Sequence, residues 1–240
     1  MKRSPFWSVI VPAYNESGRN HVREILAYLA KRTETWELII VNDGSTDDTN
    51  KELQKMNRAK KFRLISYEKN QGKGYAVKQG MLAATGEYRL FLDMDLSTPI
   101  AEMAKLRPHL GKYDVVIGTR KTKGAKVVVH QPWLRENLGK GFTLLSQLSL
   151  GVPVSDFTCG FKCFSAKVAQ KVFSHAQINR WGFDAEILFL AHKYGYVIKE
   201  IPVSWTDDSR TRVKFPEDLV NSLSELIAIR VNDLTGKYHQ

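Results

Sequence analysis

Tyr88-Arg89-Leu90-Phe91-Leu92-Asp93-Met94-Asp95 is a short apolar run that ends in two carboxylates one residue apart. The run has the length and composition of a buried β-strand. Folding requires no acids at the tip of such a strand, whereas a divalent cation that carries a diphosphate needs hard oxygen ligands on a rigid edge. Asp93 and Asp95 could also form the following turn, or cap a helix that begins after Pro99. The stretch therefore predicts a strand whose tip is either a metal site or a turn.

The chain around this stretch alternates between strand-like runs and helical periods. Such alternation is typical of an α/β fold with a mainly parallel sheet covered by helices on both faces. After residue 118 the alternation is less regular, and the last helix is amphipathic, as for core packing or contact with a membrane surface. The expected strands are 7–11, 38–41, 63–66, 88–92, 115–117, 157–164 and 197–205, and the expected helices are 21–31, 48–56, 75–84, 134–150, 183–194 and 216–234.

Polar clusters follow the predicted strands. In an open parallel sheet, ligands bind beyond the carboxyl ends of the strands. Four clusters would therefore meet at one edge, although loops are polar in any case. They are residues 12–16, 42–47, 93–95 and 118–120.

Length, composition and net charge limit the number of domains and the kinds of binding partner. The chain has 240 residues and no linker or low-complexity tract, so we expect one domain over residues 1–240. Its 36 Lys and Arg exceed its 25 Asp and Glu, which gives a net charge of +11 and favours anionic partners. No aromatic-basic strand motif for nucleic acid is present, so we expect no nucleic-acid partner. The most basic stretch, 120–140, is either a solvated loop or a site for anions.

Targeting signals and a disulfide framework are absent from the sequence. The basic start leads directly into a short strand, and no segment reaches the ~18 apolar residues of a membrane span. We therefore expect a cytoplasmic protein that is at most peripheral at the cytoplasmic face of a membrane. Cys159 and Cys163 are expected to be reduced, partly buried thiols on one face of a strand.

Several motifs together resemble the family 2 glycosyltransferases of the GT-A fold. Residues 9–16 (Val-Ile-Val-Pro-Ala-Tyr-Asn-Glu) and 41–47 (Val-Asn-Asp-Gly-Ser-Thr-Asp) lie about 25 residues apart, and the Asp-x-Asp follows about 50 residues later. Residues 71–76, 156–164, 181–186 and 235–238 resemble the polyprenyl-phosphate branch, close to the dolichyl-phosphate β-glucosyltransferases. The resemblance implies a GT-A fold with a nucleotide-sugar-binding half at 1–118. An acceptor half with a C-terminal amphipathic helix would span 119–240.

The resemblance implies roles for residues after the first two strands. Asp43 would read the nucleobase, because it can accept a hydrogen bond from a base N–H, and such buried polar matches discriminate strongly. Glu16 would bind the ribose. From the residues alone, Asp43 could also begin an Asp-Gly turn, and Glu16 could be a charge at a helix start. A backbone edge and an aromatic face for the base would come from Pro12, Ala13 and Tyr14.

The resemblance also implies ligands for a metal and a diphosphate. Asp95 would be the first metal ligand, and Asp93 would bridge to the sugar or the metal. The cofactor would be Mg²⁺ or Mn²⁺, for which two carboxylates suffice beside water and phosphate oxygens. Lys73 would contact the diphosphate between two glycines that let the backbone approach it. The third glycine of a dinucleotide-binding fingerprint is missing, which excludes that fold.

On the acceptor side, the resemblance implies two arginines for the acceptor phosphate, Arg120 and Arg135, because a guanidinium matches phosphate oxygens. Arg212 would close over the diphosphate. Asp156 would be either a base or an orienter of acceptor and donor sugar. A lipid phosphate has a second pKa of about 6 and arrives largely ionised, so cations should matter more here than a base.

The leading hypothesis is an inverting, metal-dependent enzyme. It would transfer a hexose, expected to be glucose from UDP-glucose, to a dolichyl-type polyprenyl phosphate. Basic and apolar residues within 120–140 would seat it on an anionic membrane surface. One alternative keeps the fold and transfers the sugar to a glycan or a protein. The other is a non-catalytic nucleotide-binding or scaffold protein, against which the retained acids argue.

Overall fold

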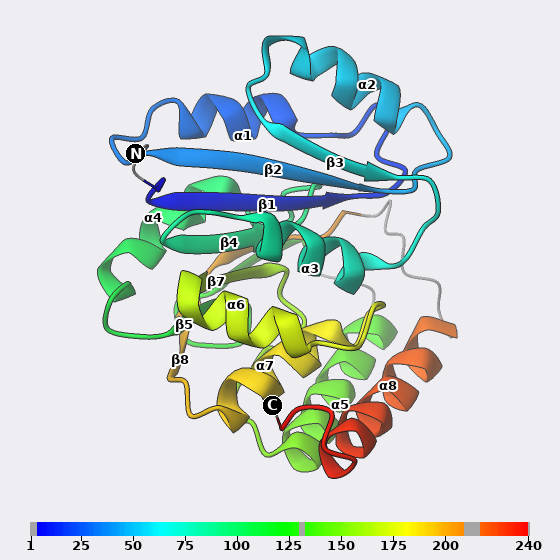
Figure 1. Ribbon diagram of the computed structural model, residues 1–240. Helices are drawn as coiled ribbons and strands as arrows, with labels where there is room; N and C mark the ends of the chain where they lie inside the picture. Colours follow the sequence, from blue (N-terminus) through cyan, green and yellow to red (C-terminus); the bar gives the residue numbers. More distant parts are fainter. Residues whose placement is uncertain (1–3, 130–132, 209–216, 240) are drawn as a thin grey trace.

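A seven-stranded sheet organises the chain in the computed structural model, which describes residues 4–129, 133–208 and 217–239 (Figure 1). The strand order is β3-β2-β1-β4-β7-β5-β8, and β7 runs antiparallel to both of its neighbours. The other neighbouring strands are parallel, as the sequence predicts. The strands are β1 (Trp7–Ala13), β2 (Trp36–Asp43), β3 (Arg63–Tyr67), β4 (Tyr88–Leu92), β5 (Val115–Thr119), β7 (Phe161–Ser165) and β8 (Ile198–Pro202).

Helices cover both faces of this sheet and leave its carboxyl edge to the loops. One apolar core lies between the sheet and α1, α2 and α4, and the other lies under α3, α5, α6, α7 and α8. Figure 1 shows α5 and α8 side by side, and they are in contact. The helices are α1 (Val22–Leu29), α2 (Thr49–Met56), α3 (Lys73–Ala83), α4 (Met103–Leu106), α5 (Trp133–Leu150), α6 (Ala166–His175), α7 (Phe183–Lys193) and α8 (Glu217–Leu234).

Alternation along the strands explains the two cores. In β2, Ile39 and Val41 contact one core while Leu38 and Ile40 contact the other, as the period of two in a strand requires. Both faces of the central strands are therefore apolar. No helix in the described residues is long and apolar enough to cross a bilayer.

Two of the expected strands are wrong in extent. In the expected strand 157–164, only Phe161 onward is extended, because Thr158 N–H donates to Asp156 Oδ1 and folds the preceding residues into a loop. The expected strand 197–205 is divided after Pro202. Its second part, β9 (Ser204–Thr206), leaves the main sheet and pairs with β6 (Lys126–Val129), a strand that was not predicted.

One helix was also missed, and the cysteines are more buried than expected. Helix α6 packs Val172 and Phe173 into the core, but no helix was predicted there. Cys163 lies in β7, whereas Cys159 lies in the preceding loop, so they do not share one strand. Both are free thiols with 1% of their surface exposed, and burial raises the pKa of Cys159 to about 11. They are therefore protonated core residues.

Candidate active site

The four polar clusters meet at the carboxyl edge of the sheet, as predicted. Strands β1, β2 and β4 are mutually parallel, and β5 runs in the same direction because β7 is antiparallel to both β4 and β5. The loops that follow these strands therefore share one side of the molecule.

The loops after β1 and β2 are fastened to each other. Asn15 Oδ1 accepts a hydrogen bond from Thr46 N–H at 2.8 Å, and Glu16 N–H donates to Thr49 Oγ1 at 2.7 Å. The Glu16 side chain accepts a hydrogen bond from Arg19 at 2.8 Å and is buried. The acid expected at a ribose is thus present at this edge, held by a neighbouring arginine.

Asp43 organises the loop that leads into α3. Its Oδ1 accepts a hydrogen bond from Gln71 N–H at 2.8 Å, and its Oδ2 accepts from Gly72 N–H at 3.0 Å and from Asn70 Nδ2 at 2.8 Å. Only 2% of Asp43 is exposed, and burial raises its pKa despite these donors. Any base N–H that binds this carboxylate would share it with the loop.

Lys73 joins this loop to the tip of β4. It is the first residue of α3, and its Nζ lies 2.6 Å from Asp93 Oδ1. Burial alone would lower the pKa of Lys73, but the nearby carboxylates of Asp93 and Asp184 raise it above its usual value. Lys73 is therefore a charged side chain beside the Asp-x-Asp, where the resemblance expects a diphosphate.

The donor set at the β4 tip fits a divalent cation that also binds phosphate. Asp95 Oδ1 accepts a hydrogen bond from Ser97 N–H at 2.9 Å. Burial, and then the charge of Asp93, raise the pKa of Asp95, so the two carboxylates repel each other and would gain from a cation. Within the described part of the chain, no group of three or more metal-binding side chains occurs. The remaining ligands of Mg²⁺ or Mn²⁺ would be water and phosphate oxygens.

Gly160 lies against the same acid. A Cβ atom at Gly160 would come 2.0 Å from Asp93 Oδ2, a distance too short for any real Cβ contact. A side chain here would displace the carboxylate. The loop before β7 and the tip of β4 therefore form one surface.

We expect Gly160→Ala to weaken Mn²⁺ binding in the presence of UDP by about tenfold, because it displaces Asp93, one of the two carboxylates expected to bind the metal. Gly139→Ala is the matched control, since a Cβ at Gly139 meets nothing within 4 Å. Isothermal titration calorimetry would measure both affinities. Equal affinities in the two variants would refute the role of Asp93 at the metal.

Asp156, which is fully buried, forms an ion pair with Arg120, 17% of whose side chain is exposed. Arg120 Nε lies 2.7 Å from Asp156 Oδ2, and Nη2 lies 2.8 Å from Oδ1. Arg120 Cζ lies 5.1 Å from the ring centre of Trp205. Burial alone would raise the pKa of Asp156, but Arg120 lowers it far below the usual range. The pair favours the orienting role for Asp156 over that of a base.

Two of the predicted arginines cannot be placed at the site. Arg135 lies on α5, but its side chain is outside the described set, and Arg212 lies outside the described residues altogether. Pro12 and Tyr14 are partly buried and Ala13 is buried, at the end of β1.

A second ion pair, with both side chains buried, was not predicted. Lys162 Nζ lies 2.5 Å from Asp184 Oδ1 and donates to the Cys159 carbonyl at 2.6 Å. Lys162 is fully buried, and a lysine within an apolar strand is the signal that could have revealed it. Glu200 was also missed. Its carboxylate accepts hydrogen bonds from the backbone N–H groups of Ser155 and Asp156, and so it supports the Asp156–Arg120 pair.

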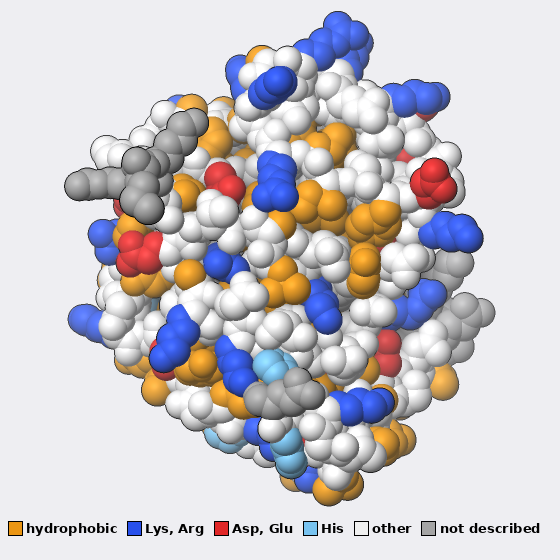
Figure 2. Space-filling view, viewed as in Figure 1, with side chains coloured by type: hydrophobic (Ala, Val, Ile, Leu, Met, Phe, Trp, Pro, Cys, Tyr) orange, Lys and Arg blue, Asp and Glu red, His pale blue; other side chains and the backbone are white. Residues whose placement is uncertain are grey.

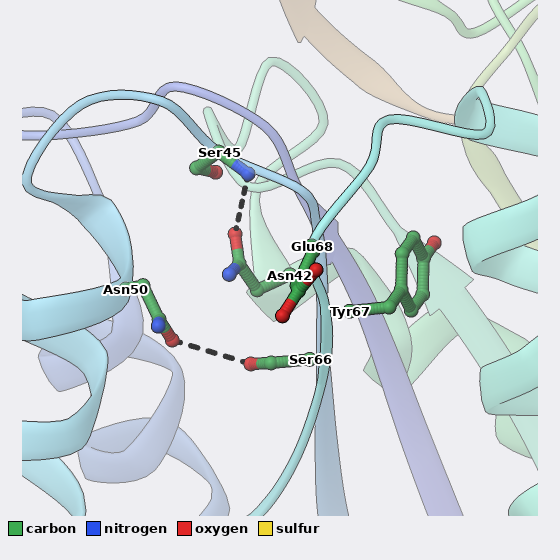
Figure 3. Close-up of a pocket in the computed structure, with 6 residues that line it drawn as sticks. All are labelled: Asn42, Ser45, Asn50, Ser66, Tyr67 and Glu68. Atoms are coloured by element: carbon green, nitrogen blue, oxygen red, sulfur yellow. Dashed lines mark hydrogen bonds between the residues drawn. The ribbon is translucent and has the colours of Figure 1, made fainter.

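A polar pocket opens beside the site, on the α2 side of β2 and β3 (Figure 3). There Asn42 accepts a hydrogen bond from Ser45 N–H, and Asn50 from Ser66. Tyr67 turns its ring away from Asn50 and Ser66 in Figure 3, toward Tyr75 of α3. The pocket is lined by Asn42, Ser45, Asn50, Ser66, Tyr67 and Glu68, and its lining includes neither Asp93 nor Asp95.

Residues 8–173 match the model of the family described as glycosyl transferase family 2. The chain belongs to glycosyl transferase family 2. Among its relatives, the dolichyl-phosphate β-glucosyltransferase of Saccharomyces cerevisiae is 33% identical, over 97% of this chain and 76% of that protein. The dolichyl-phosphate β-glucosyltransferase of Homo sapiens is 32% identical, over 96% of this chain and 76% of that protein.

Solved structures share the fold. Glucosyl-3-phosphoglycerate synthase from Mycobacterium tuberculosis, in complex with Mn²⁺, UDP and phosphoglyceric acid, superimposes with a TM-score of 0.67. Its sequence is 20% identical, and the match covers 98% of this chain and 78% of that one. The expected GT-A fold is confirmed.

Proposed function

We propose that this chain transfers glucose from UDP-glucose to a dolichyl-type polyprenyl phosphate. The observation that carries the proposal is the similarity to dolichyl-phosphate β-glucosyltransferases over nearly the whole chain, so that it includes the acceptor half as well as the nucleotide half. Similarity confined to the first strands would have supported a donor nucleotide alone. Two ion pairs at the sheet edge, Lys73–Asp93 and Arg120–Asp156, fit this reaction.

The reaction is one displacement at the anomeric carbon. An oxygen of the acceptor phosphate forms a bond to that carbon while the bond from the carbon to the diphosphate oxygen breaks. The electron pair of the broken bond leaves with UDP, and the configuration inverts. The acceptor phosphate is largely ionised near neutral pH, because its second pKa is about 6, so no protein group has to remove a proton.

On the donor side, Asp93 and Asp95 would hold Mg²⁺ or Mn²⁺, which when bound supplies positive charge that stabilises the departing diphosphate. Lys73 lies beside Asp93 and adds a second positive charge at the same place. Asp43 keeps the loop before Lys73 in place through three hydrogen bonds. Lys73 is thus held in place before the reaction, next to where negative charge would develop on the departing diphosphate, and such fixed charges stabilise a transition state most effectively.

On the acceptor side, Arg120 would bind the incoming phosphate. Its hydrogen bonds to Asp156 and Thr158 use Nε and Nη2, and Nη1 has no partner among residues 4–129, 133–208 and 217–239. Nη1 is therefore available for a phosphate oxygen. Asp156 holds the guanidinium plane and partly balances its charge, which limits the cost of burying it.

The acceptor is a lipid, and we place the enzyme at the cytoplasmic face of an anionic membrane. Exposed apolar side chains lie near exposed lysines between β5 and the start of α5: Val128 is 69% and Trp133 79% exposed, and Lys123 and Lys126 are also exposed. Figure 2 shows Lys and Arg spread over the face that α3 and α6 cover, among fewer Asp and Glu. Aromatic and basic side chains together favour the headgroup region of anionic bilayers.

We expect the protein to sediment with vesicles that contain phosphatidylserine, and to do so less at high salt, because the attraction is partly electrostatic. Trp133→Ala should reduce this binding. Val197→Ala serves as control, because Val197 is exposed but lies just before β8, at the opposite end of the sheet. Equal binding to neutral and anionic vesicles, unaffected by Trp133→Ala, would refute this surface.

The proposed reaction is tested by incubating the protein with Mg²⁺, dolichyl phosphate and radiolabelled UDP-glucose, then extracting the lipid. Label should enter the lipid fraction and depend on the metal. Parallel reactions with other nucleotide-sugars test the donor, and reactions with soluble glycans or proteins test the alternative acceptors. Label in a soluble product, with none in lipid for any donor, would overturn the proposal.

A further inference from the structure

Two segments that carry the family resemblance, residues 181–186 and 235–238, are in contact with each other. Glu186 of α7 is fully buried, and so is Tyr238, which follows α8 near the C-terminal end of the chain. The Tyr238 hydroxyl donates to Glu186 Oε1 at 2.5 Å. Figure 1 shows the C-terminal end of the chain beside α7. The role of this contact follows from what else Glu186 binds.

Glu186 also holds the chain between α6 and α7, which we call the crossing segment (residues 176–179). Its Oε1 accepts a hydrogen bond from Gln177 N–H at 2.8 Å, and its Oε2 accepts from Ile178 N–H at 2.9 Å. Three donors from two parts of the chain thus converge on one buried carboxylate. Removing one of them leaves a buried acceptor less satisfied and the crossing segment less constrained.

The crossing segment in turn lies on the first turns of α3. Tyr75 N–H donates to the Asn179 carbonyl at 3.1 Å, and Lys78 Nζ donates to the Ala176 carbonyl at 2.7 Å. A Cβ at Gly74 would come 2.7 Å from the Ile178 carbonyl oxygen, so the two backbones are in direct contact. The residue before Gly74 is Lys73, whose Nζ lies beside Asp93.

We infer that Tyr238 is a positioning residue for the donor site: through Glu186 and the crossing segment it sets the place of Lys73, and thereby the affinity for the diphosphate of the donor. Tyr238 is fully buried, so we assign it a positioning role rather than contact with substrate or metal. The segment after α8 is thus part of the scaffold of the nucleotide site, although it belongs to the acceptor half in sequence. This inference rests on the proposed nucleotide-sugar donor.

Tyr238→Phe keeps the buried ring and removes the hydroxyl. We expect it to weaken UDP binding, and to raise the KM for UDP-glucose, by about fivefold, while the KM for dolichyl phosphate stays within twofold. Tyr194→Phe is the matched control. The Tyr194 hydroxyl donates to the Tyr238 carbonyl at 3.0 Å. This change therefore removes a hydrogen bond to the same residue, Tyr238, but keeps the hydrogen bond between Tyr238 and Glu186. It should leave UDP affinity within twofold of wild type.

A double-mutant cycle separates positioning from a general loss of stability. In a Lys73→Met background, Tyr238→Phe should no longer change UDP affinity, because the group it positions is gone. Calorimetry with UDP and Mn²⁺ provides the readout for all four proteins. The inference is overturned if Tyr238→Phe binds UDP as wild type does, if Tyr194→Phe weakens it equally, or if the effect persists without Lys73. Wild-type protein that does not bind UDP would overturn the proposed donor as well.

Discussion

Replacing Asp95 with Ala should lower the rate of glucose transfer by about a thousandfold, because a metal that stabilises the leaving diphosphate is worth several kcal/mol. The same change should weaken Mn²⁺ binding measured with UDP present. It should not destabilise the fold. Burial and the neighbouring Asp93 raise the pKa of Asp95, so its ionised form opposes folding at neutral pH. The melting temperature of the metal-free variant should therefore equal or exceed that of wild type.

Asp48→Ala is the control for this prediction. Asp48 is an exposed acid that pairs with Lys51 on the surface, and it should lose less than twofold in rate. Transfer by Asp95→Ala at the wild-type rate, or full wild-type activity in excess EDTA, would contradict the assignment of the β4 tip as the metal site.

Replacing Asp156 with Asn should lower the free energy of unfolding by about 3–5 kcal/mol, since it leaves the largely buried guanidinium of Arg120 without its counter-charge. Denaturant titration measures this loss. Transfer should also fall, by roughly a hundredfold, because Arg120 is no longer held in one orientation. Arg120→Lys changes the other partner of the same ion pair. A lysine keeps the positive charge but cannot form the two hydrogen bonds that Arg120 makes to Asp156.

The pH dependence of this effect has a definite sign. Because the pKa of Asp156 is lowered in the folded protein, its contribution to stability is fully present above the unfolded pKa of about 3.9. The contribution is lost only as the pH falls through the lower, folded value. The difference in unfolding free energy between wild type and Asp156→Asn should therefore be constant from about pH 5 to pH 8. A difference that disappears within this window would contradict the pair.

Local pattern was sufficient to predict the parallel strands and the acids at their tips. Asp43 and Asp93 follow apolar runs in the sequence, and a parallel sheet necessarily brings such positions to one edge. The place of β6 was not predictable in this way, because it pairs with β9, which lies more than seventy residues later and only after the chain has left the main sheet at Pro202.

Side-chain partners depend on tertiary register and could not be deduced from spacing. Arg120 and Asp156 were both identified, but as separate contacts to substrate, and their pairing follows from the antiparallel placement of β7 beside β5. The partner of Lys162 was not predictable, because Asp184 lies in α7, which is separated from β7 in the sequence by the whole of α6. Buried charges of this kind need the fold before their partners are known.

In the proposed reaction the acceptor arrives already charged, and cations, rather than a base, receive it. The most direct test compares dolichyl phosphate with dolichol, the same lipid without its phosphate, as acceptors of label from UDP-glucose. We predict transfer to dolichyl phosphate and none to dolichol at any pH from 7 to 9, the range in which a second phosphate pKa of about 6 leaves the acceptor largely ionised. Comparable transfer to dolichol would show that a hydroxyl is activated by the protein and would contradict the account.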